Sequence, residues 1–249
     1  MQREMPILGH LEELRRRIFI ALIAILAATA VSFIFSDRIL QIILLPSGGM
    51  QLKAFSLMDG FLIKWQLALY AGIVIAFPIW AFQLYRFISP GLLANERKMV
   101  FPLTFGSLLL FALGTAFGFY LLWGVIRVLV QFFPPDVQLL PTADDYISFV
   151  IFFLLACGLA FQLPTVLVML VQLRVLSALI MRKQRRLAYF LLFAFAEIIT
   201  PVSDPIIAPL TVMAPLVILY EFSILAAGRI EAGRKRTEAA STSIIDPSR

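Results

Sequence analysis

The chain has 249 residues, of which 61% are hydrophobic and 14% are charged, and its mean hydropathy is +0.94. Soluble domains are nearer half apolar and a quarter charged, so this composition excludes an ordinary water-soluble fold and predicts burial in a lipid bilayer. The net charge of +6 raises the alternative of a nucleic-acid partner, but basic residues in a membrane protein mostly record topology, and we expect no such partner.

Six apolar segments follow one another along the chain. We expect each to be a transmembrane helix, because lipid offers no water to satisfy the backbone polar groups. The segments cover residues 18–35, 65–88, 101–129, 147–173, 187–200 and 206–226. They predict an all-α integral membrane protein with one six-helix domain over residues 1–228. The remaining residues 229–249 are charged and then rich in Ser, Thr and Ala, which predicts a disordered cytoplasmic tail.

The basic residues alternate between the segments that connect these helices. The N-terminal segment, the second and fourth loops and the C-terminal tail together hold 17 of the 21 lysines and arginines. The third loop, by contrast, holds aspartates and no basic residue. Cytoplasmic loops carry the excess of Lys and Arg, so the pattern predicts that both termini lie in the cytoplasm. An even number of spans, such as six, satisfies that orientation.

The predicted helices are neither uniform in length nor straight. The fifth segment, residues 187–200, would reach only about 21 Å, less than the hydrocarbon core of roughly 30 Å. The sixth segment is also short if Glu221 marks the end at which that helix reaches water. Prolines lie within or near the ends of several spans, and proline bends a helix. These features favour bent helices that form a concave body, although prolines are also simply common in membrane helices.

No pattern of residues indicates an enzyme. The chain has one histidine, His10, and one cysteine, Cys157, which excludes most His/Cys metal sites. We find no H-E-x-x-H, G-x-S-x-G, P-loop or dinucleotide-binding sequence, and no paired aspartates at membrane depth. We therefore expect no catalytic residue, no metal and no cofactor.

The residues that stand out are carboxylates in unusual places. Glu13 and Glu96 lie among basic residues at the start of the first helix and after the second, and either can be an ordinary surface residue. Asp204 lies in the predicted outer turn, where an N-cap is the simpler interpretation. Glu197 and Glu221 fall within the fifth and sixth spans. An ionisable side chain at membrane depth is costly unless it meets water or a partner, so Glu197 is a candidate functional residue.

Several short strings together resemble one known family, the TatC family of the twin-arginine protein translocase. The resemblance covers about residues 5–230. It is carried, in chain order, by His10-Leu11-x-Glu13-Leu14-Arg15-x-Arg17, by Phe87-Ile88-x-Pro90-Gly91-Leu92 with Glu96-Arg97-Lys98, by Phe161-Gln162-Leu163-Pro164, by Thr200-Pro201 with Asp204, and by Tyr220-Glu221.

The resemblance implies a receptor in the cytoplasmic (inner) membrane of a prokaryote. Such a protein binds signal peptides with paired arginines and supports export of folded proteins, driven by the proton-motive force. It works with single-span subunits of the TatA and TatB type, within a receptor complex in which we expect a homo-oligomer surrounded by membrane lipid. By resemblance, Glu13 and Glu96 would receive the two guanidinium groups, and Arg15, Phe87 and Pro90 would shape that surface. A carboxylate can accept a guanidinium bidentately, which a lysine cannot reproduce.

The chain departs from the family pattern at Gln162, where the family often has a glutamate. We hypothesise that Glu197 supplies the missing carboxylate and contacts polar groups of partner helices. By resemblance, Asp204 would fall in the outer turn that matters for transport, and Glu221 matches a polar site near the inner end of helix six. The alternative function is a small secondary transporter or channel with an intramembrane carboxylate site.

Overall fold

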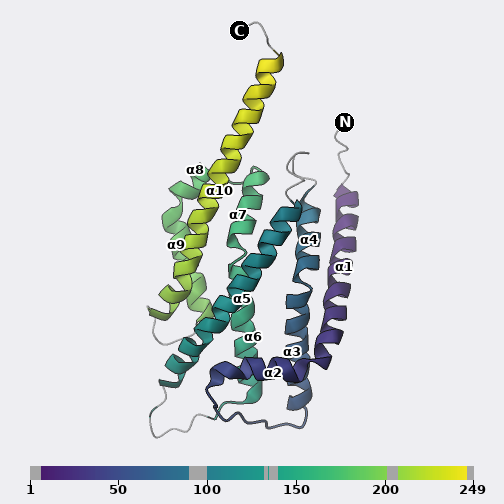
Figure 1. Ribbon diagram of the computed structural model, residues 1–249, viewed down its shortest axis with the longest axis vertical. Coiled ribbons are helices and arrows are strands. Elements are labelled where there is room, and N and C mark those ends of the chain that lie inside the picture. The colour runs from purple at the N-terminus through teal and green to yellow at the C-terminus, as the bar shows by residue number, and fades with distance from the viewer. Residues whose placement is uncertain (1–6, 90–99, 132–133, 135–139, 201–206, 246–249) are drawn as a thin grey trace. The chain divides into compact units, whose positions relative to one another are not determined.

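The structure is a computed structural model that describes residues 7–89, 100–131, 134, 140–200 and 207–245. Helices make up most of the described chain, joined by turns and one isolated β-bridge between Lys53 and Thr142. The chain divides into two compact units, residues 1–159 and 160–249. Figure 1 shows the helices of both units.

Unit 1 begins with a long helix, α1, and a short helix, α2, that runs across its end. Helix α1 (Ile7–Ile34) is followed after Phe35 by α2 (Ser36–Leu44), which lies across the ends of α1 and α3 in Figure 1. A short 3-10 turn, η1 (Leu45–Ser47), then ends at Gly48, whose φ of 63° is left-handed. Glycine adopts this conformation without a Cβ penalty, so Gly48 lets the chain turn away from α2.

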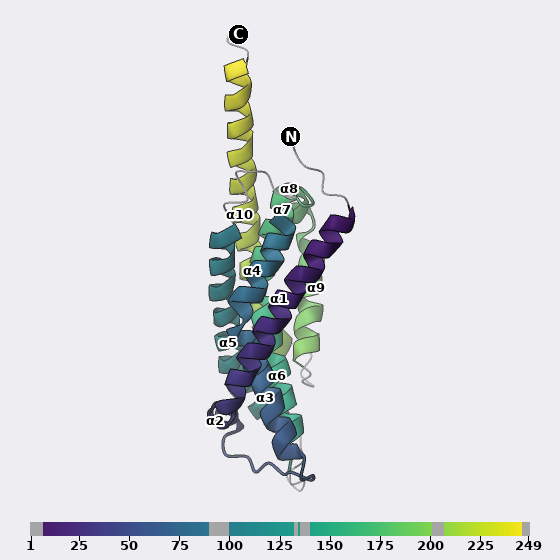
Figure 2. The same cartoon turned by 90° about the vertical axis from the view of Figure 1, so that its right-hand side faces the viewer.

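The second predicted span is a bent pair of helices. Helices α3 (Asp59–Ile75) and α4 (Phe77–Ile88) meet at Ala76 with an angle of 52°. Pro78 lies in the first turn of α4, where its missing N–H cannot continue the hydrogen bonds of α3. The bend predicted from the prolines is therefore present here. Figure 2 shows α1 running beside both α3 and α4.

Small residues allow the helices of unit 1 to pack closely. Gly72 in α3 lies against Thr29 of α1, so close that a Cβ at Gly72 would be 2.2 Å from the Thr29 hydroxyl oxygen. Helix α5 (Val100–Gln131) meets α6 (Ala143–Ala160) in the same way, through Gly118 against Cys157 and Gly158 against Phe111. Cys157 is buried in this contact, as expected for a small apolar residue.

Unit 2 contains one helix that is longer than the sequence predicts. The helices of unit 2 are α7 (Leu163–Gln172), α8 (Ala178–Lys183), α9 (Arg185–Ile199) and α10 (Ile207–Ile245), and α10 is the long one. The sequence predicts a short sixth helix and disorder from residue 229, but α10 continues as one helix to Ile245. The physical reason is that the residues after Gly228 include many Ala, Glu, Arg and Lys, which are strong helix formers even where few residues are apolar.

The described helices account for four to five membrane crossings. Four continuous stretches are long and apolar enough, namely residues 9–34, 101–131, 143–172 and 209–234, and the bent pair α3–α4 makes a fifth. The chain is therefore a multi-pass membrane protein. The fifth predicted span corresponds to α9, whose 15 residues rise only about 22 Å. The predicted total of six spans therefore depends on whether α9 crosses, and it stays a prediction.

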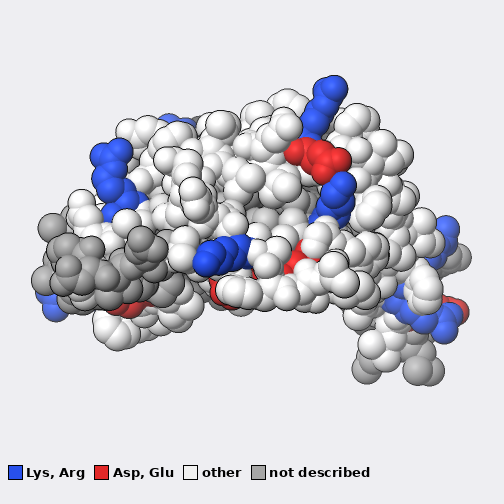
Figure 3. Space-filling view, turned by 90° about the horizontal axis from the view of Figure 1, so that it is seen from below, with Lys and Arg blue, Asp and Glu red and all other residues white. Residues whose placement is uncertain are grey.

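Both ends of unit 1 carry acidic and basic side chains. The end with the start of α1 and the end of α4 carries four arginines, Arg15, Arg16, Arg17 and Arg86, beside Glu12 and Glu13. At the other end Lys64 is paired to Asp37 at 2.8 Å. Figure 3 views this second end from below and shows charged side chains scattered over a mostly uncharged surface.

Candidate functional site

The first turns of α1 hold a cluster of charged side chains with regular helical spacing. Glu13 and Arg17 are four residues apart, so their side chains meet on one face of the helix. Arg17 donates from Nε to Oε1 of Glu13 at 3.0 Å, and its Nη2 contacts the same oxygen. Both side chains are largely buried, with 15% of Arg17 and 21% of Glu13 exposed. Partial burial makes this pair stronger than an exposed surface ion pair.

Helix α4 completes the cluster from a distant part of the sequence. Arg17 also donates from Nη1 to Oε1 of Gln83 at 3.2 Å. The imidazole ring of His10 stacks on the ring of Phe87, with centroids 4.3 Å apart and an interplanar angle of 13°. The start of α1 and the end of α4 are thus joined by one polar and one aromatic contact. A short peptide could touch both helices at this end of unit 1.

One oxygen of the Glu13 carboxylate accepts hydrogen bonds, and the other accepts none from the described residues. Oε1 accepts from Arg17, whereas Oε2 is buried and receives no hydrogen bond from any residue that the structure describes. Nδ1 of His10 lies 3.8 Å from Oε2, which exceeds hydrogen-bond distance. A buried carboxylate oxygen without a donor is costly. A cationic donor that reached this oxygen would remove that cost.

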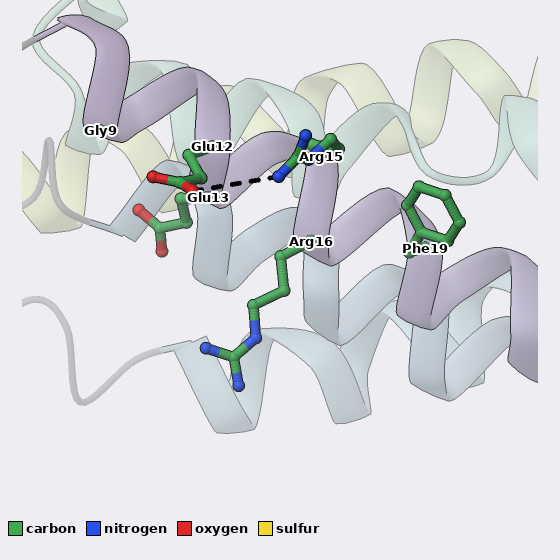
Figure 4. Close-up of a pocket in the computed structure, with 6 residues that line it drawn as sticks. All are labelled: Gly9, Glu12, Glu13, Arg15, Arg16 and Phe19. Atoms are coloured by element: carbon green, nitrogen blue, oxygen red, sulfur yellow. Dashed lines mark ion pairs between the residues drawn. The ribbon is translucent and has the colours of Figure 1, made fainter.

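Two depressions in the surface adjoin Glu13. The larger is open, has a volume of about 700 Å³ and is lined by Gly9, Glu12, Glu13, Arg15, Arg16 and Phe19. Figure 4 shows its acidic side chains at the start of α1 and Phe19 further along the helix. The smaller, of about 180 Å³, lies between α1 and α4 and is lined by Glu13, Arg16, Arg17, Ile20, Gln83 and Arg86. The lining of the larger depression combines acidic, basic and aromatic side chains, so it offers both charged and apolar contacts.

The neighbouring pair of Glu12 and Arg15 differs from the pair of Glu13 and Arg17. The side chains of Glu12 and Arg15 are 76% and 73% exposed, and their closest charged atoms are 3.9 Å apart. An exposed pair at that distance contributes little. Glu12 therefore differs from Glu13 mainly in burial and in lacking a fixed partner, which makes it a matched comparison for experiments on Glu13.

The residues predicted from the sequence fall partly within the described structure. Glu13 and Phe87 lie at the same end of unit 1, both in contact with His10. Arg15 lies two residues after Glu13, and its exposed side chain approaches Glu12. Pro90 and Glu96 lie outside the described residues. The sequence reasoning did not single out His10, Arg17 and Gln83 as site residues; the four-residue spacing from Glu13 could have indicated Arg17.

The predicted residues of unit 2 occupy different surroundings. Glu221 is fully engaged, because Oε2 accepts from Arg185 at 2.6 Å and Oε1 accepts from the Tyr189 hydroxyl at 2.6 Å. Gln162 is buried at the break before α7. Glu197 is half-buried on α9, and its Oε2 is buried with no hydrogen-bond partner in the described part of the chain. Asp204 lies outside the described residues.

Glu221 thus joins the start of α9 to the middle of α10. The family resemblance implies a polar site at Glu221, and the observed contacts give that carboxylate two donors from α9. Nothing in the described ranges gathers three or more His, Cys, Asp or Glu side chains in a way that could hold a metal ion.

Comparison with known proteins gives one consistent family. A family model described as Sec-independent protein translocase protein (TatC) matches residues 9–215. The TatC protein of Carboxydothermus hydrogenoformans is 34% identical over 228 residues, which cover 90% of this chain and 93% of the relative. The TatCy protein of Bacillus subtilis is 32% identical, covering 89% of this chain and 88% of the relative.

Solved structures agree with the sequence comparison. A crystal structure of the twin arginine translocase receptor TatC in DDM matches with a TM-score of 0.76 and 31% identity, covering 88% of this chain and 99% of that chain. A second crystal structure of the same receptor matches with a TM-score of 0.73 and 30% identity, covering 88% and 98%.

Proposed function

This chain belongs to the TatC family of Sec-independent protein translocase proteins, and we propose that the start of α1 and the end of α4 bind the paired arginines of export signal peptides. The chain is a non-enzymatic transport component, the receptor subunit of a twin-arginine translocase. The binding site is the part of this function that the residues of unit 1 allow us to argue in detail.

The Glu13 carboxylate oxygen without a hydrogen-bond donor, Oε2, carries the proposal. Arg17 holds Oε1, so the carboxylate is already oriented before a ligand arrives, and Oε2 remains without a donor in the described structure. A guanidinium of the signal peptide supplies that donor and removes the cost of the unsatisfied oxygen. A preoriented acceptor also loses little side-chain freedom on binding, which favours affinity.

The second arginine of the peptide is bound, in this proposal, by Glu96. Glu96 follows α4 closely in the chain, eight residues after its last residue, Ile88. Phe87 and Pro90 provide the apolar part of the surface, and the exposed Arg15 sets its edge. Two ion pairs near solvent give modest affinity, and a receptor that must later release its cargo needs a modest affinity.

Around this site we propose the arrangement that the family name implies. The protein lies in the cytoplasmic membrane of a prokaryote with both termini in the cytoplasm, where signal peptides of folded cargo approach. It assembles with single-span TatA and TatB type subunits and with further copies of itself. Glu197, Gln162, Asp204 and Glu221 are the candidate residues for transport or partner contact, with Glu197 supplying the carboxylate that Gln162 lacks.

Equilibrium binding of a fluorescent signal peptide to the purified protein tests the site. Glu13→Gln should weaken binding of a paired-arginine peptide at least about tenfold, because hydrogen bonds to charged groups contribute about 1.5–3 kcal/mol. Glu12→Gln is the matched control and should leave binding within about twofold. A paired-lysine peptide should bind weakly to every variant. Equal losses in Glu12→Gln and Glu13→Gln would show only a general acidic attraction and would refute the Glu13 assignment.

A further inference from the structure

The helices of unit 2 hold α8 and the start of α9 in a fixed position. Glu231 of α10 accepts a hydrogen bond from the backbone N–H of Ala178 at 2.9 Å, and the Tyr220 hydroxyl donates to the carbonyl of Met181 at 3.0 Å. Ala178 and Met181 are buried against this support. Arg185 at the start of α9 is tied to Glu221. The short helix α8 is therefore anchored along one side, and its other side chains face outward.

The outward-facing residues combine cations with apolar side chains. We call Leu179, Arg182, Lys183, Arg186 and Leu187 the α8–α9 surface, and all five are exposed. Residues 174–187 contain five basic residues and no acidic one. Long basic side chains lay their methylene stems on apolar surface and keep the charged group in the polar region of a membrane. The composition of this surface fits the boundary between headgroups and hydrocarbon.

Three cations of the surface have no partner among the residues that the structure describes. Arg182, Lys183 and Arg186 make no ion pair or hydrogen bond with any described residue, whereas the neighbouring Arg185 is neutralised by Glu221. The guanidinium of Arg182 lies next to Gly228 of α10, with Nη2 3.7 Å from the position that a Cβ would occupy. Three unpaired positive charges within five residues repel one another unless an anion lies between them.

We propose that the α8–α9 surface binds the headgroups of anionic phospholipids. The phosphate supplies the missing negative charge, and Leu179 and Leu187 lie beside the acyl chains of the same lipid. The rigid support from α10 keeps the three cations together, so that little ordering is required on binding. This inference depends on the membrane location of the chain and not on the signal-peptide site.

Lipid titration of the purified protein, followed by native mass spectrometry, tests the proposal. Phosphatidylglycerol and phosphatidylcholine with identical acyl chains are added separately, and the dissociation constant of the first bound lipid is measured. The wild-type protein should prefer phosphatidylglycerol. The triple variant R182Q/K183Q/R186Q should lose at least tenfold of that preference, because each cation near an anionic surface contributes roughly a fivefold increase in binding.

A matched triple variant separates a defined surface from net charge. R38Q/K53Q/R127Q removes the same number of charges from unit 1 and should keep the wild-type preference. Signal-peptide binding by both variants should be unchanged, so failure of the lipid proposal is distinguishable from failure of the receptor site. Equal lipid preference in wild type and R182Q/K183Q/R186Q overturns the proposal. Equal losses in both triple variants, or displacement of the lipid by inorganic phosphate alone, overturn it as well.

Discussion

At the scale of single residues, contacts with α4 determine which arginine at the start of α1 pairs with Glu13. Arg16 and Arg17 lie three and four residues after Glu13, and either could pair with it on an isolated helix. Gln83 of α4 decides between them, because it accepts a second hydrogen bond from Arg17. Arg16 is instead exposed and makes no ion pair with a described residue. Arg17 therefore links α1 to α4, whereas Arg16 makes no such contact with a described residue.

The difference between these two arginines predicts their effects on stability. Arg17→Gln removes the ion pair with Glu13 and the bond to Gln83 in a largely buried position. We expect a loss of about 1–3 kcal/mol in the free energy of unfolding. Arg16→Gln, the control on the same helix, should change stability by less than about 0.5 kcal/mol. Thermal unfolding of the purified proteins in detergent measures both. Indistinguishable melting temperatures would contradict the assigned role of Arg17.

The stacked ring of His10 leads to a second prediction at this scale. His10 contacts Phe87 through its ring and approaches Glu13 through Nδ1. An aromatic pair contributes about 0.5–1.5 kcal/mol beyond simple burial, so His10→Ala should weaken signal-peptide binding by roughly two- to tenfold. His10→Phe keeps the stack and should restore most of the affinity. Binding that is lost equally in both variants would show that the imidazole nitrogens, rather than the ring, are required.

The sequence identified Glu13 as a candidate but not the partners that orient it. Charge spacing along one helix is visible in a sequence, so the presence of an acidic and basic cluster at residues 12–17 could be predicted. The choice of Arg17 over Arg16, and the approach of His10 to Phe87, require the packing of α1 on α4. That packing depends on side chains throughout both helices, and no local pattern encodes it.

Helices were predicted well where apolar runs and prolines determine them, and less well where polar contacts do. The bend at Ala76 follows from Pro78, and the shortness of α9 follows from the length of its apolar run. The low content of apolar residues after residue 228 predicts disorder, whereas α10 continues to Ile245. Glu231 and Arg234 explain part of this difference, since they bond to the start of α8 and the end of α7. These contacts stabilise a polar helix that lacks an apolar face.

Close packing of α1 on α3 gives a prediction for a single glycine. A Cβ at position 72 would lie 2.2 Å from Oγ1 and 2.8 Å from the backbone nitrogen of Thr29. Gly72→Ala should therefore separate the two helices and destabilise the protein by about 1–3 kcal/mol. Gly60→Ala in the same helix meets no atom within 4 Å and serves as the control. Thr29→Gly should rescue Gly72→Ala only in part, because the backbone nitrogen of residue 29 remains.

At the scale of the whole molecule, the number of membrane crossings depends on α9 and its contacts with α10. Glu221 and Tyr220 of α10 contact Arg185 and Met181, so the start of α9 lies beside the middle of α10. The part of α10 before Glu221, residues 207–220, rises roughly 21 Å, close to the length of α9. The two segments therefore pair antiparallel over similar lengths, while α10 continues past Glu221, so that residues 209–234 are long enough to cross by themselves. Of the two helices only α9 is shorter than a hydrocarbon core of about 30 Å, so its crossing requires a locally thinned bilayer.

Labelling with a membrane-impermeant thiol reagent tests the six-span arrangement. Cys157 is buried, so the unsubstituted chain should react little and serves as the background. We expect cysteines at the exposed positions Arg16, Gln184 and Arg229 to react only from the cytoplasmic side. A cysteine at Gln51, in the exposed loop after η1, should react only from the other side. The reason is that six crossings return residues 184 and 229 to the side of the N-terminus, with α9 and the start of α10 as the last crossing pair. Reaction of Arg16→Cys and Arg229→Cys from opposite sides would mean an odd number of crossings, and α9 would then be a re-entrant segment.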